Sequence, residues 1–333
     1  MLVVGLGSIG ALHLRLARKL LPDSDIRVLR HRYHDAAPEH ADGCFSSLDE
    51  AIKFAPQLAV IANPASMHLS VAKSLAQVGA HLLIEKPLSS SAEGVSDFLY
   101  NCRQYGVTLL VGYNLRFLRS LQVFRDLVQQ GAVGHVLSVR SEIGQYLPSW
   151  RPGTDYRIGV SARHDLGGGV LLELSHELDY LRWIFGEVAS VNALLSRQSE
   201  LEIDVEDSAY LALRFVAGGA GRQLVATVNM DFIRHDTTRV CLAIGEKGSL
   251  RWNGISGLVE QLDAGTEKWQ KIFQHQHQRD ESYLFEWQHL LDCLSNQQCP
   301  SIPGEDGQKV LQIITAARES SEIGKWVAVS ALP

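Results

Sequence analysis

The sequence has no excess of positive charge and no long apolar run. Its 31 lysine and arginine residues face 37 aspartate and glutamate residues, which gives a formal net charge of −6. This balance is not the pattern of a protein that binds nucleic acid or an anionic membrane surface. No apolar stretch approaches the roughly 18 residues that a membrane span needs. The chain start also shows no charged leader and no cleavage site, so we expect a cytoplasmic protein without nucleic-acid or membrane partners.

Cysteine is scarce and unpatterned. The five residues are scattered and form no Cys-x-x-Cys pair: Cys44, Cys102, Cys241, Cys293 and Cys299. A disulfide framework is therefore not expected, and free thiols in a reducing compartment fit better.

Metal-ligating patterns are also missing. His176-Glu177 begins like a His-Glu-x-x-His motif, but Tyr180 stands where the second histidine belongs. His275 and His277 lie in a Gln-rich polar stretch that is typical of a solvated loop. We expect no bound metal.

The first third of the chain alternates strands and helices. The 333 residues, of which 46% are hydrophobic and 20% charged, suit a globular protein of about two domains. Helical stretches near 11–21, 47–54, 67–78 and 91–105 separate short apolar runs. This alternation predicts an α/β domain with a doubly wound parallel sheet over residues 1–117. The predicted strands are Leu2–Val4, Ile26–Leu29, Leu58–Ala62, His81–Ile84 and Thr108–Val111.

After Phe117 the pattern changes. Helices near 118–130 and 169–185 flank a strand, Val136–Ile143, and a Pro/Gly-rich stretch. Long strands joined by hairpin-like turns such as Gly218-Gly219 favour an antiparallel sheet. We predict an α+β domain with a large, mostly antiparallel open sheet over residues 118–333. Its other predicted elements are strands near 188–196, 207–216, 222–232, 237–244 and 248–252, and helices near 279–296 and 306–321.

The first ten residues carry the most informative motif. The apolar run Met1–Val4 leads directly into Gly5-Leu6-Gly7-Ser8-Ile9-Gly10, and a helical pattern follows. A strand that passes through G-x-G-x-x-G into a helix is the dinucleotide-binding fingerprint. Gly5 permits the tight turn, Gly7 admits a pyrophosphate, and Gly10 lets helix and strand pack closely. Only four residues precede Gly5, so either the strand is short or the natural start lies upstream.

The end of the second strand bears on the choice of cofactor. NAD-binding domains have an acid there that holds the adenosine ribose. This chain has Arg30-His31-Arg32 instead, and two guanidiniums there would suit a ribose 2′-phosphate. The sequence therefore favours NADP over NAD. The alternative is a solvated basic turn that contacts no cofactor.

Two further motifs end the third and fourth predicted strands. Asn63-Pro64 is followed by His68, and Glu85-Lys86-Pro87 ends the next strand. Because ligands of open α/β sheets sit at the carboxyl ends of the strands, Lys86 falls where a nicotinamide would meet its substrate. Glu85 is placed to hold the ammonium group. A plain surface turn is the alternative for this Lys-Pro pair.

Other segments follow the same order as in a known family. Tyr113–Phe117 looks like a domain junction, Gly131–Gly134 precedes a long strand, and Gly167–Gly169 precedes an acid and His176. Gly245-Glu246-Lys247-Gly248-Ser249 comes later. Together with the glycine, Asn63-Pro64 and Glu85-Lys86-Pro87 motifs, they resemble the Gfo/Idh/MocA oxidoreductases over nearly the whole chain.

The resemblance implies an NAD(P)-dependent oxidoreductase that acts on a secondary alcohol or carbonyl of a sugar, a polyol or a nucleotide-linked sugar. It implies that Lys86 orients the reacting oxygen and that His176 is the acid/base, a role that suits an imidazole. The expected cofactor-binding residues are Gly5, Gly7, Ser8, Ile9, Gly10, Arg30, His31, Arg32, Asn63, Pro64, His68, Glu85, Lys86 and Asn114.

Carboxylates flank His176 at a spacing of three. On one continuous helix, Glu173 and Asp179 would lie one turn to either side of the imidazole. Glu173 is then a candidate catalytic residue that fixes the imidazole tautomer or contacts a substrate hydroxyl. The commoner family pattern has Asp four residues before the histidine, and this chain departs from it.

The stretch 145–157 mixes aromatic rings with guanidinium and amide donors. Sugars stack on aromatic faces and take hydrogen bonds at their edges, so this loop is the predicted substrate contact. A loop buried under a neighbouring subunit is the alternative. Its candidates are Tyr146, Trp150, Arg151 and Tyr156, and Arg116, Arg163, Asp179 and Tyr283 are further ones.

Two other functions share these motifs. One is a dinucleotide-binding sensor or regulator without catalysis, against which the presence of both Lys86 and His176 argues. The other is a lyase or epimerase that retains its cofactor. For the oxidoreductase, the resemblance implies a homodimer or homotetramer.

Overall fold

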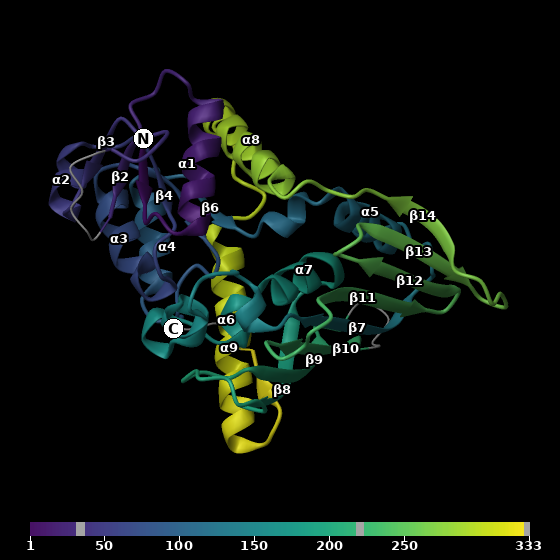
Figure 1. The fold of residues 1–333 in the computed structure, drawn as a ribbon. Coiled ribbons are helices and arrows are strands. Elements are labelled where there is room, and N and C mark those ends of the chain that lie inside the picture. Colours follow the sequence, from purple (N-terminus) through teal and green to yellow (C-terminus); the bar gives the residue numbers. More distant parts are fainter. Residues whose placement is uncertain (31–36, 218–222, 330–333) are drawn as a thin grey trace.

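The computed structural model describes residues 1–30, 37–217 and 223–329, which form two sheets (Figure 1). The first sheet has six parallel strands in the order β3-β2-β1-β4-β5-β6. Apart from the edge strand β3, its strands are mostly apolar and buried, as expected for a parallel sheet whose faces are covered by helices. They are β1 (Leu2–Val4), β2 (Arg27–Leu29), β3 (Gly43–Phe45), β4 (Leu58–Ile61), β5 (His81–Glu85) and β6 (Leu109–Gly112).

The predicted doubly wound parallel sheet is confirmed. The sequence analysis missed β3, because this edge strand has only three half-buried residues and lacks an apolar run. The strand order reverses between β1 and β4, which is where Rossmann folds bind dinucleotides. The helices of this part are α1 (Ser8–Leu20), α2 (Leu48–Lys53), α3 (Ala65–Gln77) and α4 (Val95–Gln104).

The second sheet has nine strands in the order β14-β13-β12-β11-β7-β10-β9-β8-β15. All neighbours are antiparallel except β10 and β7, so the predicted mostly antiparallel sheet is confirmed. The Gly218-Gly219 turn lies outside the described residues. The strands are β7 (Val136–Gly144), β8 (Val188–Ser196), β9 (Ser208–Phe215), β10 (Val225–Asp231), β11 (Thr238–Gly245), β12 (Gly248–Asn253), β13 (Leu258–Asp263), β14 (Gln270–Gln274) and β15 (Val327–Ala328).

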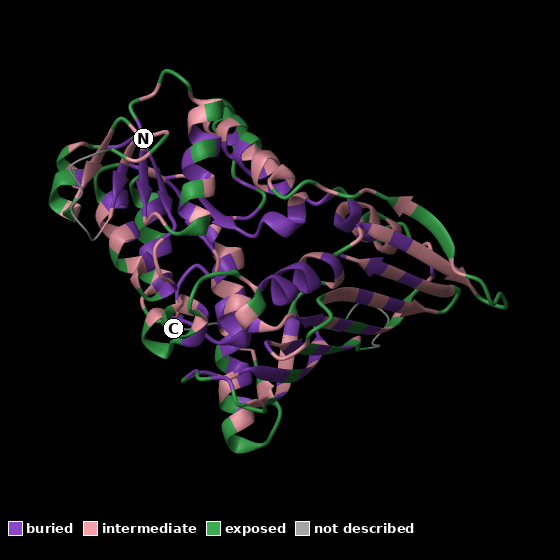
Figure 2. Ribbon diagram, in the orientation of Figure 1, coloured by how far each residue is buried: buried purple, intermediate pink, exposed green. Residues whose placement is uncertain are grey.

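Three strands of this sheet were not predicted. β13 and β14 are half-exposed and rich in polar residues, and β15 has only two residues. Figure 2 shows that much of β14 is exposed, whereas helix α7 (His176–Phe185) is buried. Besides α7, this part has α5 (Arg119–Gln129), α8 (Glu281–Asn296) and α9 (Gly304–Ile323). Within the described ranges, no helix has the length and apolarity of a membrane span.

The predicted helix over 169–185 is broken. It consists of α6 (Val170–Glu173) and α7, with Leu174 and Ser175 between them. The Glu177 N–H donates to the Leu174 carbonyl at 3.2 Å, three residues back, whereas an unbroken α-helix would pair it with Glu173. Glu173 and His176 therefore do not share one helix, so the predicted position of Glu173 one turn from the imidazole is wrong, whereas Asp179 does follow His176 within α7.

One long helix, α9, contacts both sheets (Figure 1). Near its start, Gly304 and Gly307 bring its backbone against Leu99 and Leu88 of the first half. Nearer its end it packs on β8, where Ser320 Oγ accepts the Ala193 N–H at 3.0 Å. The helix thereby fixes one sheet relative to the other.

The packing of α1 against the first sheet predicts that a methyl group added at Gly10 lowers the stability of the fold. A Cβ on Gly10 would lie 2.1 Å from the Gly5 carbonyl oxygen, whereas a Cβ on Gly7 would meet nothing within 4 Å. We expect Gly10→Ala to lower the free energy of unfolding by about 1–3 kcal/mol or more, the cost of overpacking. Gly7→Ala is the matched control and should unfold like the unmodified protein. Denaturant unfolding without added ligand checks this, and equal stability of the two variants would contradict the packing role of Gly10.

Candidate active site

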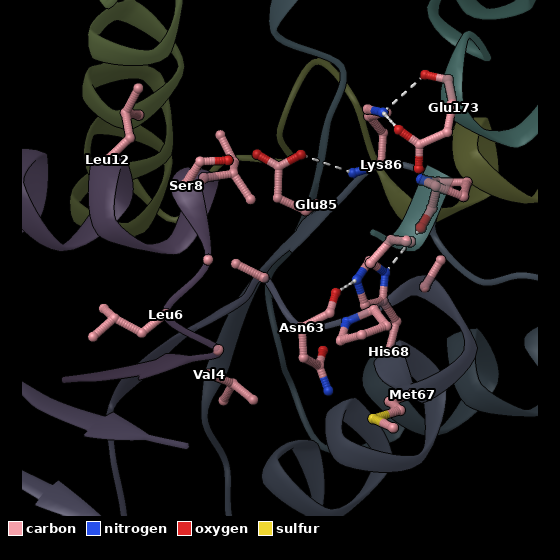
Figure 3. A pocket seen from close by; sticks show the side chains of 18 of the residues that line it. Val4, Leu6, Ser8, Leu12, Asn63, Met67, His68, Glu85, Lys86 and Glu173 are labelled. Carbon is pink, nitrogen blue, oxygen red and sulfur yellow. Dashed lines mark hydrogen bonds and ion pairs between the residues drawn. The ribbon is translucent and has the colours of Figure 1, made fainter. Parts of the chain in front are cut away.

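A cavity of about 810 Å³ lies where the carboxyl ends of the first sheet face the second half. Both halves supply its walls (Figure 3). From the first come the glycine turn, Asn63, Glu85 and Lys86, and from the second come Glu173, His176 and Arg239.

The glycine turn forms one end of this cavity. Gly5 has φ +87°, and a Cβ there would come within 2.9 Å of the Ala62–Asn63 backbone. Gly7 precedes α1, whose first turn has no side-chain cap and no acid. Its N–H groups and positive dipole end thus face the open space beside Gly7. This arrangement fits the pyrophosphate of a dinucleotide.

The end of β2 contributes Leu29 and Arg30 to the same wall, with Ser46 and Leu48 beside them. Among the described residues that line the cavity, carboxylates occur only at Glu85 and Glu173. Neither belongs to this end. His31 and Arg32 lie outside the described residues.

The Glu85 carboxylate is held from two sides. Its Oε1 lies 2.8 Å from His13 Nε2, and its Oε2 accepts the Lys86 backbone N–H at 3.1 Å. The Trp287 indole N–H donates to His13 Nδ1 at 2.9 Å, and since an indole can only donate, that nitrogen must be the acceptor. The neutral imidazole then carries its proton on Nε2 and donates it to Glu85. The prediction that Glu85 holds the Lys86 ammonium is wrong, because Glu85 holds the backbone instead.

The Lys86 ammonium bonds to Glu173. Lys86 Nζ donates to the Glu173 carbonyl at 2.9 Å and lies 3.9 Å from Glu173 Oε2 (Figure 3). That carbonyl is available because the helix breaks after Glu173. Glu173 thus positions the ammonium, and it makes no hydrogen bond to His176 that would fix a tautomer.

His176 is buried, lines the cavity and packs edge-on against Tyr113, with ring centroids 5.6 Å apart. Its Nδ1 has no hydrogen-bond partner in the described structure. Burial, and then the positive charges of Lys86 and Arg239, hold the pKa of His176 well below the ordinary histidine value. The imidazole is therefore neutral at physiological pH and able to accept a proton.

His68 joins the ends of β4 and β5. Its Nε2 lies 2.8 Å from the Asn63 carbonyl oxygen, and its Nδ1 lies 2.9 Å from the Pro87 carbonyl oxygen (Figure 3). Burial lowers the pKa of His68, so the ring is neutral and donates to one of the two carbonyls. It thereby fixes the loop carrying Asn63 beside the one carrying Lys86.

The structure brings most of the predicted residues to the cavity. The predicted residues among its lining are Gly5, Gly7, Ser8, Ile9, Arg30, Asn63, Pro64, His68, Glu85, Lys86, Trp150, Arg151, Glu173, His176 and Tyr283. Gly10 lies behind the turn, where it packs α1 against Gly5. Asn114 is buried and donates to Ser282 Oγ at 2.8 Å, so it does not line the cavity.

Arg116 and Asp179, both predicted to bind substrate, pair with each other instead. Two hydrogen bonds of 2.6 and 2.9 Å join them, and both side chains are buried away from the cavity. Arg116 also donates to Asp306 at 3.0 Å, so these charges join α7 to α9. Their prediction as substrate contacts is wrong, because each is already neutralised inside the protein.

Three more predicted substrate residues lie elsewhere. Tyr146 stacks on His235, with centroids 4.2 Å apart. The Tyr156 hydroxyl accepts the Glu202 N–H, and the exposed Arg163 pairs with Asp165. Local partners hold all three away from the cavity lining.

The sequence analysis missed several lining residues from the second half. They include Thr237, Arg239, Ile255 and Arg279. They come from strand ends and loops far apart in the chain, and no short motif marks them. Only the fold brings them together.

Two family models match the chain. One, described as an oxidoreductase family with an NAD-binding Rossmann fold, covers residues 1–113. The other, the C-terminal alpha/beta domain of an oxidoreductase family, covers residues 125–329. The chain belongs to the Gfo/Idh/MocA family of oxidoreductases. The family predicted from the sequence is thereby confirmed, and so is an oxidoreductase with an NAD-binding domain.

Relatives and solved structures of this family agree in length and fold. Myo-inositol 2-dehydrogenase of Thermotoga maritima is 26% identical over 341 residues, which cover 96% of this chain and 95% of that protein. A levoglucosan dehydrogenase in complex with NADH and levoglucosan has a TM-score of 0.84 at 20% identity and covers 99% of each chain. The WlbA dehydrogenase from Bordetella pertussis, in complex with NADH and UDP-GlcNAcA, has a TM-score of 0.81 at 22% identity and covers 99% of this chain and 98% of that one. At these identities the two structural matches establish the shared fold.

Proposed function

We propose that the protein is an NAD(P)-dependent dehydrogenase or reductase for a secondary alcohol or carbonyl of a sugar, polyol or nucleotide-linked sugar. The observation that supports this most is the meeting of Lys86, from the first sheet, and His176, from the second half, in the cavity that holds the glycine turn. The names of its relatives, which refer to myo-inositol and levoglucosan, fit this substrate class.

A nicotinamide held beside Lys86 and His176 would supply the hydride exchange with the substrate carbon. The Lys86 ammonium orients the reacting oxygen and stabilises negative charge that develops on it. The Glu173 carbonyl holds that ammonium in place. During oxidation, His176 accepts the hydroxyl proton, and during reduction it returns the proton. Burial, followed by the positive charges of Lys86 and Arg239, lowers the pKa of His176 and keeps it in the base form.

The substrate wall consists of Trp150, Arg151 and Tyr283. The Trp150 indole N–H donates to the Gln145 carbonyl at 3.0 Å, and its ring packs edge-on against Phe232 at 5.1 Å. A ring fixed in this way offers a preorganised apolar surface for a sugar face. Arg151 supplies donors for hydroxyl groups at the sugar edge.

For the cofactor, we propose that Arg30 favours a ribose 2′-phosphate, hence NADP over NAD. The support is the guanidinium at the end of β2, with no carboxylate among the described lining residues there. NADH is the cofactor in both structural matches described above, so NAD use by this chain is the direct alternative.

For the assembly, we propose a homodimer or homotetramer formed through the second sheet. Leu194, Tyr210 and Val225 are exposed on one of its faces, where strand register places Leu194 opposite Tyr210. Residues 1–117 would then be the dinucleotide-binding domain and 118–333 the substrate-binding and oligomerisation domain. A cytoplasmic location stays a prediction.

Removal of either reacting side chain should slow turnover. We expect Lys86→Ala and His176→Ala each to reduce kcat by about 10²–10⁴-fold, the contribution of a positioned acid/base. Formation of the reduced nicotinamide, measured with a panel of sugars, polyols and nucleotide sugars, checks this. Lys73→Ala, a lysine outside the cavity lining, is the control. Near-normal rates in both variants contradict the proposed roles, and tight dinucleotide binding without turnover of any compound indicates a sensor.

The charge at position 86 should set the pH dependence. A positive neighbour disfavours protonation of His176, so its loss raises the pKa of that base. In Lys86→Met, the acidic limb of log kcat/KM for alcohol oxidation should move to higher pH, whereas Lys86→Arg, which keeps the charge, should leave it in place. The acidic limb is located by measuring the residual activity of each variant between about pH 4 and 9, a range around the ordinary histidine pKa. An unmoved limb in Lys86→Met would show that Lys86 does not act on the base.

Cofactor preference gives a separate test. Arg30→Ala should weaken NADP binding by about ten-fold or more, the loss of one hydrogen bond to a charged group. NAD lacks the 2′-phosphate, so its binding should change little. Titration of both dinucleotides by intrinsic fluorescence measures the two dissociation constants, and an equal change in both rules out the 2′-phosphate contact.

A further inference from the structure

We propose that the substrate is acidic: a sugar or polyol that carries a carboxylate, which Arg239 binds. This inference rests on the proposed dehydrogenase function and narrows its substrate class. Arg239 lines the cavity from β11, and its partner Glu177 directly follows His176 in α7. The proposed carboxylate site therefore adjoins the proposed acid/base.

The contact with Glu177 fixes only one edge of the Arg239 guanidinium. Arg239 Nε donates to Glu177 Oε1 at 2.8 Å, and the Glu177 side chain has no exposed surface. Neither Nη nitrogen of Arg239 has a hydrogen-bond acceptor among the described residues. The pair of Arg116 with Asp179 differs, because there both carboxylate oxygens accept, one from Nε and one from an Nη nitrogen.

The other Glu177 oxygen supports this reading. Glu177 Oε2 is buried without a hydrogen-bond partner in the described structure, which is costly for a carboxylate. Glu177 therefore fixes the Nε edge of the Arg239 guanidinium and leaves both Nη groups without an acceptor among the described residues. Two Nη groups in one plane are the donors that a carboxylate accepts in a bidentate pair.

The charge of the residues that line the cavity also favours an acidic substrate. The chain as a whole has a net charge of −6, yet the cavity lining contains five arginines and lysines against two glutamates. Both glutamates are engaged, Glu85 with His13 and the Lys86 N–H, and Glu173 with the Lys86 ammonium. The exposed side chains of Arg151 and Arg279 have no acidic partner among the described residues. Such a field attracts an anionic substrate.

A phosphate group shares this oxyanion chemistry with a carboxylate. We assign the carboxylate because the prepared receptor is a single planar guanidinium held at one edge, with an uncharged Thr237 near it in the lining. The test therefore compares each neutral sugar with its uronic acid and its 6-phosphate: glucose, glucuronate and glucose 6-phosphate, and the galactose and mannose sets.

Two measurements use this panel on the full-length protein with saturating dinucleotide. In the first, uronates should raise the melting temperature, and the neutral sugars should leave it unchanged. In the second, kcat/KM for the uronate that is turned over should exceed that of its neutral parent by at least ten-fold. Arg239→Gln should abolish the shift and lower the ratio of kcat/KM for the acid to kcat/KM for its neutral parent by about 10–100-fold, mainly through KM for the acid. The ratio is the readout because the charge of Arg239, after burial and the charge of Lys86, also lowers the pKa of His176, so its loss affects turnover of both compounds.

Two further variants control for folding. Arg251→Gln removes an arginine of the same sheet that pairs with Glu260 outside the cavity lining, so it should keep the preference for acids. Because Arg239→Gln leaves Glu177 buried without its partner, Glu177→Gln with Arg239→Gln removes that charge as well. This double variant should fold and show the same loss of acid preference.

The outcomes separate the two proposals. Failure of every compound to be turned over, with dinucleotide binding intact, overturns the dehydrogenase function. Turnover without an acid preference, or an equal loss for acid and neutral parent in Arg239→Gln, overturns only the acidic substrate. A larger shift with 6-phosphates than with uronates overturns the carboxylate assignment, as does the absence of any uronate shift.

Discussion

The site depends on one bond between the two halves, from the Lys86 ammonium to the Glu173 carbonyl. A largely enclosed ammonium needs acceptors, and a carbonyl inside a regular helix is already paired. Because the helix breaks after Glu173, the Glu173 carbonyl has no partner within the helix. It is therefore free to accept a hydrogen bond from the Lys86 ammonium. The same break starts α7 at His176, so one local irregularity positions both side chains.

Behind Lys86, a chain of hydrogen bonds keeps its charge available. The Trp287 indole sets the His13 tautomer, His13 donates to Glu85, and Glu85 accepts the Lys86 backbone N–H. The nearby Glu286 carboxyl is also buried, and burial, followed by the charge of Glu85, raises the pKa of Glu286 well above its ordinary value. A neutral Glu286 adds no second negative charge that would compete for the ammonium.

The first sheet and its site residues could be predicted because their signals are local. A glycine turn after a strand, or Lys86 after another strand, is placed by its own neighbours at the carboxyl edge of the sheet. The break at Leu174 and Ser175 has no comparable signal, since neither residue is a strong helix breaker. The position of the break is explained only by the tertiary structure, in which Lys86, 87 residues away in sequence, donates to the Glu173 carbonyl.

The second half was harder to predict for the same reason. Arg239 is directed by Glu177, 62 residues earlier, and nothing near Arg239 in the chain marks it. Arg116 and Asp179 looked like substrate contacts because they are charged residues in motif segments, yet the fold pairs them in its interior. Which charges remain for a ligand is thus decided by tertiary partners and not by residue type.

The helix α9 has a mechanical consequence. It is 20 residues and so about 30 Å long, and it is packed through Gly304 and Gly307 at one end and through Ser320 at the other. A hinge motion that separated the two sheets would have to bend α9 or break its packing at one end. Entry of substrate and release of product therefore depend on movements of surface loops at the edge of the cavity. The distance between Lys86 and His176 then stays constant.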